Sequence, residues 1–259
     1  MSALPVLFLS HGSPMHALLP SAATQVWAEL AQALPRPRAV LIASAHWESA
    51  QPLLGAAEGL RTIHDFGGFP EALYRIQYPA RGEPALAGQA LALLRSAGFM
   101  AQLDPDRGLD HGAWVPLSKM FPQADLPVLS LSIQPARDGA HHLALGRALA
   151  PLREQGVLII ASGHMTHNLR DMQPGNPVPT PYAQAFRDWV AARLQEGDAA
   201  GLQDWERLAP HARQAHPTPE HFLPLLVALG AAAGDPARCV HAGFEFGALA
   251  MDAWCFGEC

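Results

Sequence analysis

The stretch VLIIASGH, residues 157–164, joins a short apolar run to a histidine, and two other places in the chain share this pattern. Residues 6–9 lead to His11, and residues 40–43 lead to His46. Each apolar run is short, which is typical of a buried strand. In an open α/β sheet, ligands bind in the crevice outside the carboxyl ends of the strands. We therefore expect histidines from separate strands to meet at one edge of a sheet.

Helical patterns alternate with the strand-like runs. We expect helices over residues 22–34, 84–97, 139–155 (kinked at Pro151), 181–194 and 220–229. A further strand is expected over 126–133, and an edge strand within 245–256. Such alternation predicts an α/β fold in which a mostly parallel central sheet is flanked by helices. No polar linker divides the chain, so we expect one catalytic domain over residues 1–259.

Composition excludes several classes of protein. The chain of 259 residues is 49% hydrophobic and 15% charged, which fits a globular protein with a large core. A formal net charge of -6 and the lack of a basic run argue against a nucleic-acid partner. The sequence has no apolar run long enough for a membrane helix and no basic N-terminal signal. A cytoplasmic monomer or homodimer is expected.

The three cysteines, Cys239, Cys255 and Cys259, all lie near the C-terminus. Disulfide frameworks usually use an even and denser set of cysteines. We expect reduced thiols that catalysis does not need.

Four histidine-bearing segments are candidates for a shared metal site, because imidazoles that converge from separate elements can bind one ion. They contribute His11, His46, His221 and one of His164 and His167. In the segment SGHMTHN, residues 162–168, either histidine could face the crevice.

The other histidines divide into two groups. His64 and His111 lie in segments rich in glycine and aromatic residues, which are expected to be loops, and loops often carry binding residues. His16, His141, His142, His211 and His241 are expected in loops or on the surface, and His216 in the proline-rich approach to the last helix. The chain has no HExxH helix motif, Walker loop or GxSxG elbow.

Six motifs in order resemble a known family. They are SHGSP (10–14), SAHW (44–47), TIHDFGGFP (62–70), LDHGAW (109–114), THNL (166–169) and PTPEHFLPL (217–225). Together they are similar to the DOPA 4,5-dioxygenase type of the class III extradiol ring-cleavage dioxygenases. The resemblance runs from His11 to about residue 230 and so covers most of the chain.

The resemblance implies roles for particular residues. His11, His46 and His221 would bind one divalent metal ion, and His167 would be the catalytic acid/base. The loops of His64 and His111 would line the substrate pocket. Related enzymes use two histidines and a glutamate, so Glu220 is the alternative third ligand.

The implied reaction opens a catechol such as DOPA with O2, by 4,5-cleavage to a muconic semialdehyde, and needs iron(II). Three imidazoles with one open position also suit zinc, which activates water near neutral pH. Zinc could therefore occupy the isolated protein, and a zinc-dependent hydrolase is the alternative enzyme. A protein that binds an aromatic ligand without turnover is the non-enzymatic alternative.

Overall fold

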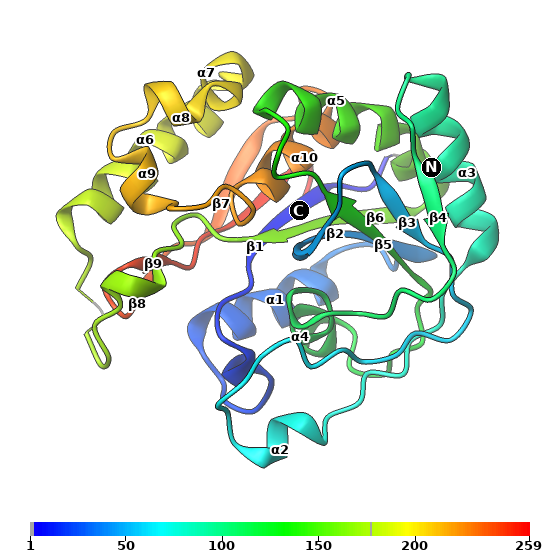
Figure 1. Cartoon of the computed structure of the whole chain (residues 1–259), viewed down its shortest axis with the longest axis horizontal. Coiled ribbons are helices and arrows are strands. Elements are labelled where there is room, and N and C mark those ends of the chain that lie inside the picture. Colours follow the sequence, from blue (N-terminus) through cyan, green and yellow to red (C-terminus); the bar gives the residue numbers. More distant parts are fainter. Residues whose placement is uncertain (1–2, 177) are drawn as a thin grey trace.

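A twisted central sheet runs through the computed structural model, which describes residues 3–176 and 178–259 (Figure 1). Within these residues the sheet has eight strands in the order β4-β3-β5-β2-β6-β1-β10-β7. Their bounds are β1 (Val6–Ser10), β2 (Ala39–Glu48), β3 (Leu53–Gly55), β4 (Gln102–Asp104), β5 (Val128–Ile133), β6 (Val157–Gly163), β7 (Ala237–His241) and β10 (Ala253–Phe256). The four central strands β5, β2, β6 and β1 are parallel, which confirms the predicted sheet type.

Helices cover both faces of this sheet (Figure 1). The α-helices are α1 (Ala22–Ala33), α2 (Glu71–Tyr74), α3 (Pro84–Ser96), α4 (His111–Met120), α5 (Gly139–Leu149), α6 (Pro181–Glu196), α7 (Ala199–Gln203), α8 (Trp205–Leu208), α9 (Ala212–Ala215) and α10 (Leu223–Ala232). Short 3₁₀ turns are η1 (Pro14–Ala17), η2 (Ala150–Gln155) and η3 (Leu169–Asp171). Helices α3, α5, α6 and α10 pack on one face, and α1 and α4 on the other.

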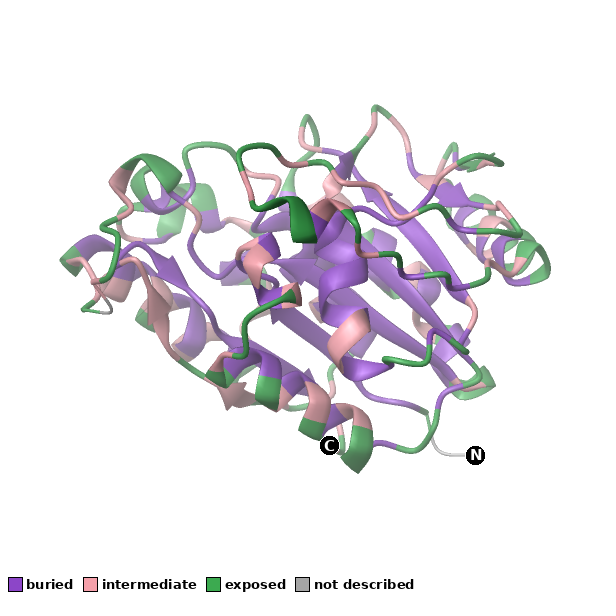
Figure 2. Cartoon of the chain, turned by 90° about the horizontal axis from the view of Figure 1, so that it is seen from below, coloured by how far each residue is buried: buried purple, intermediate pink, exposed green. Residues whose placement is uncertain are grey.

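The central strands are buried on both sides, as the continuous purple strands in Figure 2 show. In β1, Val6 and Phe8 belong to one core, whereas Leu7 and Leu9 belong to the other. Successive side chains of a strand point to opposite faces. A strand with helices on both faces therefore reads as an unbroken apolar run.

The register brings the ends of three strands together. Ser10 of β1 lies beside Gly163 of β6, and Ser44 of β2 lies beside Ser162. The segments that follow these residues therefore share one edge of the sheet. Strand β2 continues to Glu48, so His46 lies near the end of this strand rather than after it.

The prediction for the C-terminal tail was wrong in part. Residues 253–256 do form a strand, β10, but it lies inside the sheet between β1 and β7 and is fully buried. Strand β7, which the sequence did not predict, takes the edge instead. Before β10, the short strands β8 (Phe244–Glu245) and β9 (Leu249–Ala250) form a separate hairpin.

Two further expectations need correction. The last helix begins at Leu223 rather than residue 220, so His221 lies in the turn before α10. The structure pairs Cys255 and Cys259 in a disulfide, so the expectation of three free thiols was wrong. Cys255 lies beside Cys259 because the chain turns back after β10, while Cys239 stays free.

Within the described residues, none of the helices combines the length and apolar character needed to cross a bilayer.

Candidate metal centre

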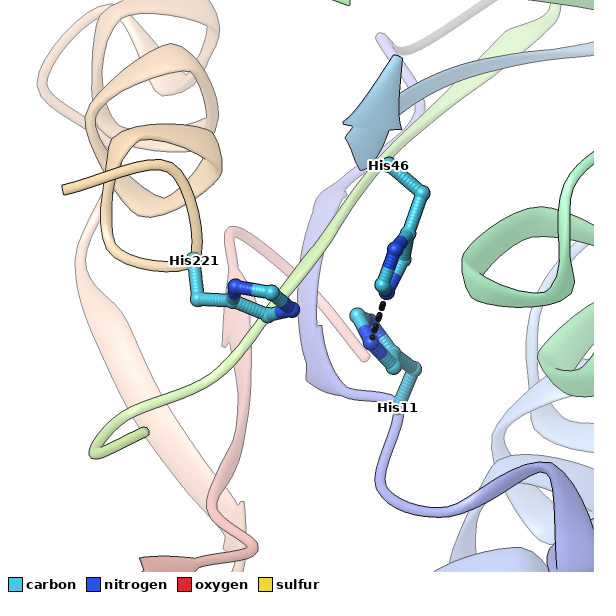
Figure 3. A group of neighbouring side chains, drawn as sticks. All are labelled: His11, His46 and His221. Carbon is cyan, nitrogen blue, oxygen red and sulfur yellow. Dashed lines mark hydrogen bonds between the residues drawn. The ribbon is translucent and has the colours of Figure 1, made fainter. Parts of the chain in front are cut away.

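Three imidazoles that the sequence singled out meet at the carboxyl edge of the sheet (Figure 3). His11 follows β1, His46 lies near the end of β2, and His221 precedes α10. One nitrogen from each ring lies within 4.8 Å of those from the other two. Segments far apart in sequence thus deliver three neutral donors to one point.

Nδ1 of His11, the ring nitrogen that faces away from His46, has a defined partner. It lies 3.0 Å from Oγ of Ser162, and that hydroxyl donates its own proton to the carbonyl of Gly112. The Ser162 oxygen must therefore accept from His11, which puts the ring proton on Nδ1. Nε2 of His11 is left as an acceptor that faces His46.

The contact between His11 and His46 needs either a hydrogen atom or a cation between the two ring nitrogens. Their Nε2 atoms are 3.0 Å apart, the contact dashed in Figure 3, and two lone pairs cannot face each other at this distance. Either a proton lies between them or a cation takes its place. Nδ1 of His46 lies 3.4 Å from the Asp65 carboxylate, which favours the ring proton on that side and leaves Nε2 to a cation.

His221 completes the arrangement. Its Nδ1 lies 2.9 Å from Oε1 of Glu220, so the ring N–H donates a hydrogen bond to the carboxylate. Its Nε2 is buried and has no hydrogen-bond partner among the described residues. A buried polar atom without a partner is costly, and a metal ion would satisfy it. Histidine ligands in metal sites commonly donate their other N–H to a carboxylate, a backbone carbonyl or water, as His221 does here to Glu220.

Burial keeps these rings neutral. It lowers the pKa of His11 and His221 well below the usual value, and repulsion from neighbouring imidazoles adds to the effect. Burial, followed by the neighbouring His111, lowers the pKa of His46 to about 4. Neutral imidazole is the form that binds metal ions, so near pH 7 the three rings are ready to do so.

A cavity of about 560 Å³ opens beside the three histidines, a size suited to a small-molecule ligand. Apart from histidines, its wall is made chiefly of apolar side chains: Met15, Phe66, Phe69, Leu169, Met172, Phe246 and Leu249. An apolar cavity with a few converging nitrogens is suited to a flat aromatic ligand that approaches a metal ion.

His167 and His164 have different positions. His167 lies on the cavity wall, and its ring stacks on that of His221 with centroids 3.4 Å apart. Burial, followed by nearby histidines, lowers its pKa to about 3. His164 also reaches the wall, but its Nε2 accepts the N–H of Gly12 at 2.9 Å, so it holds the turn after β1.

The two expected loops both reach the cavity, through different residues. His111 lines it from the start of α4, with its Nδ1 2.9 Å from Asp65. His64 is not part of the cavity wall, because its Nε2 contacts the carbonyl of Ile76 at 3.0 Å. From the loop that carries His64, the residues that line the cavity are Phe66 and Phe69.

Sequence reasoning missed several wall residues. Phe246 and Leu249 come from the β8–β9 hairpin, and Phe246 has a φ of 53°, which is uncommon for a residue other than glycine. No sequence motif indicated them.

His16 and His142 were expected in loops or on the surface, yet both are buried. His16 lies 3.1 Å from Glu245, and His142 is held between the Asp138 carbonyl and the Gln134 N–H.

A family model described as the catalytic LigB subunit of aromatic ring-opening dioxygenase matches residues 5–252. The chain belongs to this family. Two relatives named 4,5-DOPA dioxygenase extradiol, from Beta vulgaris and Escherichia coli K12, are each 43% identical to it. Each alignment covers 96% of this chain, with 95% and 93% of the respective relative.

A crystal structure of an uncharacterized protein from Escherichia coli K12 has the same fold, with a TM-score of 0.84 and 37% sequence identity. The structural alignment covers 98% of this chain and 100% of the Escherichia coli protein. The resemblance inferred from six motifs is therefore confirmed. This LigB-family chain is an extradiol aromatic ring-opening dioxygenase, and the relatives do not favour the zinc hydrolase alternative.

Proposed function

We propose that this dioxygenase opens the ring of catechols such as DOPA by 4,5-cleavage, which gives a muconic semialdehyde. The observation that carries the proposal is the convergence of three imidazole nitrogens at the wall of an apolar cavity. The names of the relatives point to DOPA as a substrate. O2 is the second substrate.

In this proposal His11, His46 and His221 bind one divalent ion through Nε2. The partners of their Nδ1 atoms support this assignment, since Ser162, Asp65 and Glu220 each offer an oxygen to one ring. Glu220, the alternative ligand, is engaged with His221 and so supports the ligand rather than replacing it.

We further propose that iron(II) is the active ion. When bound, iron(II) would exchange electrons with both the catechol and O2, whereas d¹⁰ zinc has no redox chemistry. Three neutral imidazoles bring no negative charge, and zinc lies above iron(II) in the general order of affinities. Isolated protein that contains zinc would thus be consistent with an iron-dependent activity.

His167 is proposed as the acid/base. Because burial keeps its imidazole neutral, a ring nitrogen is available to accept the proton of a catechol hydroxyl and to return it later. Its stacking on His221 holds this ring beside the three proposed ligands. Phe66, Phe246 and the other apolar wall residues would orient the aromatic ring and exclude water.

The test is to remove all metal, reload the protein anaerobically with iron(II) or zinc, and add DOPA and oxygen. We expect one mole of oxygen consumed per mole of DOPA and a yellow product with iron, and neither with zinc. Failure of the iron-loaded protein to consume oxygen across a panel of catechols would refute the proposal.

A further inference from the structure

The carboxylate of Asp65 lies between two histidines of the site. Its Oδ2 is 2.9 Å from Nδ1 of His111 and 3.4 Å from Nδ1 of His46. Its Oδ1 accepts the backbone N–H of His111 at 2.8 Å, which anchors the carboxylate to the start of α4. The rings of His46 and His111 lie close together, with centroids 4.0 Å apart.

The chemistry of a carboxylate restricts both rings. An ionised carboxylate only accepts hydrogen bonds, so Nδ1 of His111, which bonds to it, must carry the ring proton. At 3.4 Å, too long for a well-formed bond, its negative charge favours a proton on the facing Nδ1 of His46 as well. Asp65 therefore favours Nδ1–H in both His46 and His111. Their Nε2 atoms are then free of protons, as a metal ligand requires at His46.

We propose that Asp65 is a positioning residue that sets the tautomer and orientation of His46 and His111 together. This inference rests on the proposed function, because it takes His46 as a metal ligand and His111 as a residue of the substrate cavity. One carboxylate would then fix the ring orientation of a metal ligand, His46, and of a residue of the cavity wall, His111.

A different role for the same three residues is that of a second metal site, since one atom from each lies within 4.8 Å of the others. The hydrogen bonds argue against it. Both oxygens of Asp65 already accept from His111. A cation there would also need the Nδ1 lone pair of His46, and this would move the ring proton to the nitrogen that faces His11.

The experiment compares Asp65→Ala and Asp65→Asn with Asp125→Asn, a matched control at an exposed aspartate paired with Arg36. Zinc affinity is measured by competition with a chelator, and bound metal is counted per chain. We expect a 10- to 100-fold weaker affinity in both Asp65 variants, the range typical of a lost partner of a ligating histidine. The control should match the wild type.

A second measurement separates positioning from a purely structural role. Long-range ¹H–¹⁵N spectra of the metal-free protein report the tautomer of His111, with its signal assigned from the His111→Gln variant. We expect Nδ1–H in the wild type and loss of that preference in Asp65→Ala. A structural role alone would lower stability without moving the tautomer or the zinc affinity of the folded protein.

Three outcomes would overturn the inference. They are zinc affinity within threefold of the wild type, an unchanged His111 tautomer, and two bound ions of which Asp65→Ala loses one. The inference and the proposed function can fail separately. If the metal results hold but no catechol is turned over, only the function fails. If turnover is normal and Asp65→Ala binds zinc like the wild type, only the role of Asp65 fails.

Discussion

The imidazole of His167 lies flat against that of His221, with ring centroids 3.4 Å apart and planes inclined by 12°. The two rings come from segments that are far apart in the sequence but adjacent in space, one after β6 and the other before α10, where the His164 N–H donates to the carbonyl of His221. Stacking places His167 beside a proposed ligand, and one of its nitrogens lies within 4.8 Å of Glu220 and His221, but His167 does not belong to the group formed by His11, His46 and His221. This geometry fits a proton carrier better than a fourth ligand.

Replacing His167 should therefore separate chemistry from metal binding. We expect His167→Phe to keep the flat contact with His221 and to retain metal, while turnover falls about 10²- to 10⁴-fold, the usual contribution of an acid/base. Metal content and single-turnover rates with DOPA would check this. His211→Asn is the matched control, because His211 is exposed and asparagine tolerates its φ of 56°. Loss of metal from His167→Phe would contradict the assignment.

The third ligand can be tested by a pair of neighbouring substitutions. We expect His221→Ala to lose bound metal almost completely, because a ring nitrogen disappears. Glu220→Gln should weaken metal binding only about 10- to 100-fold, because it alters the partner of that ring. Chelator competition would measure both. Full occupancy in His221→Ala together with loss in Glu220→Ala would transfer the ligand role to Glu220.

Stability of the metal-free protein should fall in mild acid. Burial lowers the pKa of His142 to about 4, and its Nε2 accepts the N–H of Gln134, so the folded state holds it neutral. The unfolded chain binds this proton near pH 6.5. Above about pH 6.5 the free energy of unfolding therefore has its full value with respect to this group. It decreases as the pH falls toward 4, and protonation of His142 accounts for up to about 3 kcal/mol of that decrease.

Urea unfolding at pH 7 and pH 5 would measure this difference. His142→Gln should be less stable than the wild type at pH 7 but should show a shallower dependence on pH. An equal dependence in both proteins would show that other groups account for the effect.

Phe246 should affect substrate binding more than chemistry. Its ring lines the same cavity as the three histidines, but it comes from the β8–β9 hairpin and belongs to none of the groups that could hold a metal ion. Loss of about 1–2 kcal/mol of apolar contact in Phe246→Ala predicts a KM for DOPA about 5- to 30-fold higher, with kcat nearly unchanged. Phe244→Ala is the control, since Phe244 lies on the same hairpin and packs against the core rather than the cavity. Equal effects of the two substitutions would argue for damage to the hairpin itself.

The C-terminal disulfide should be dispensable for catalysis. Cys255 and Cys259 lie outside the cavity wall, and their bond joins β10 only to a residue four positions further along the chain. We expect Cys259→Ser to keep full metal content and activity, and thiol titration of the unreduced wild type to find one free cysteine, Cys239. Loss of metal or activity in Cys259→Ser would show that this disulfide supports the site.

The main strands could be predicted from the sequence because their signal is local. Residues 6–9, 40–43 and 157–161 are apolar without interruption, since helices cover both faces of the sheet. Parallel strands then place their carboxyl ends at one edge, so the local pattern was enough to predict that His11 and His46 meet there. The six ordered motifs are also local stretches of sequence, so they were enough to identify the family.

Some elements were not predicted, either because their local signal is weak or because a signal was missed. Strands β3 and β4 have three residues each, and β7 is only half-buried, so none shows a clear apolar pattern. The segment LDHGAW was expected to be a loop, yet α4 begins at His111, where Asp110 caps it by accepting the N–H of Ala113. A capping aspartate of this kind is a signal that was present and was missed.

What the sequence alone determined was the sheet, the family and the histidines that reach its carboxyl edge, because short-range patterns encode strands and motifs. Only the tertiary structure decided which oxygen faces each imidazole, which histidine braces the Gly12 turn, and that Phe246 rather than His64 lines the cavity. Those contacts join segments far apart in the chain; Ser162 meets His11 across 151 positions. No local periodicity records such a pairing, since it depends on how the whole sheet and its loops pack.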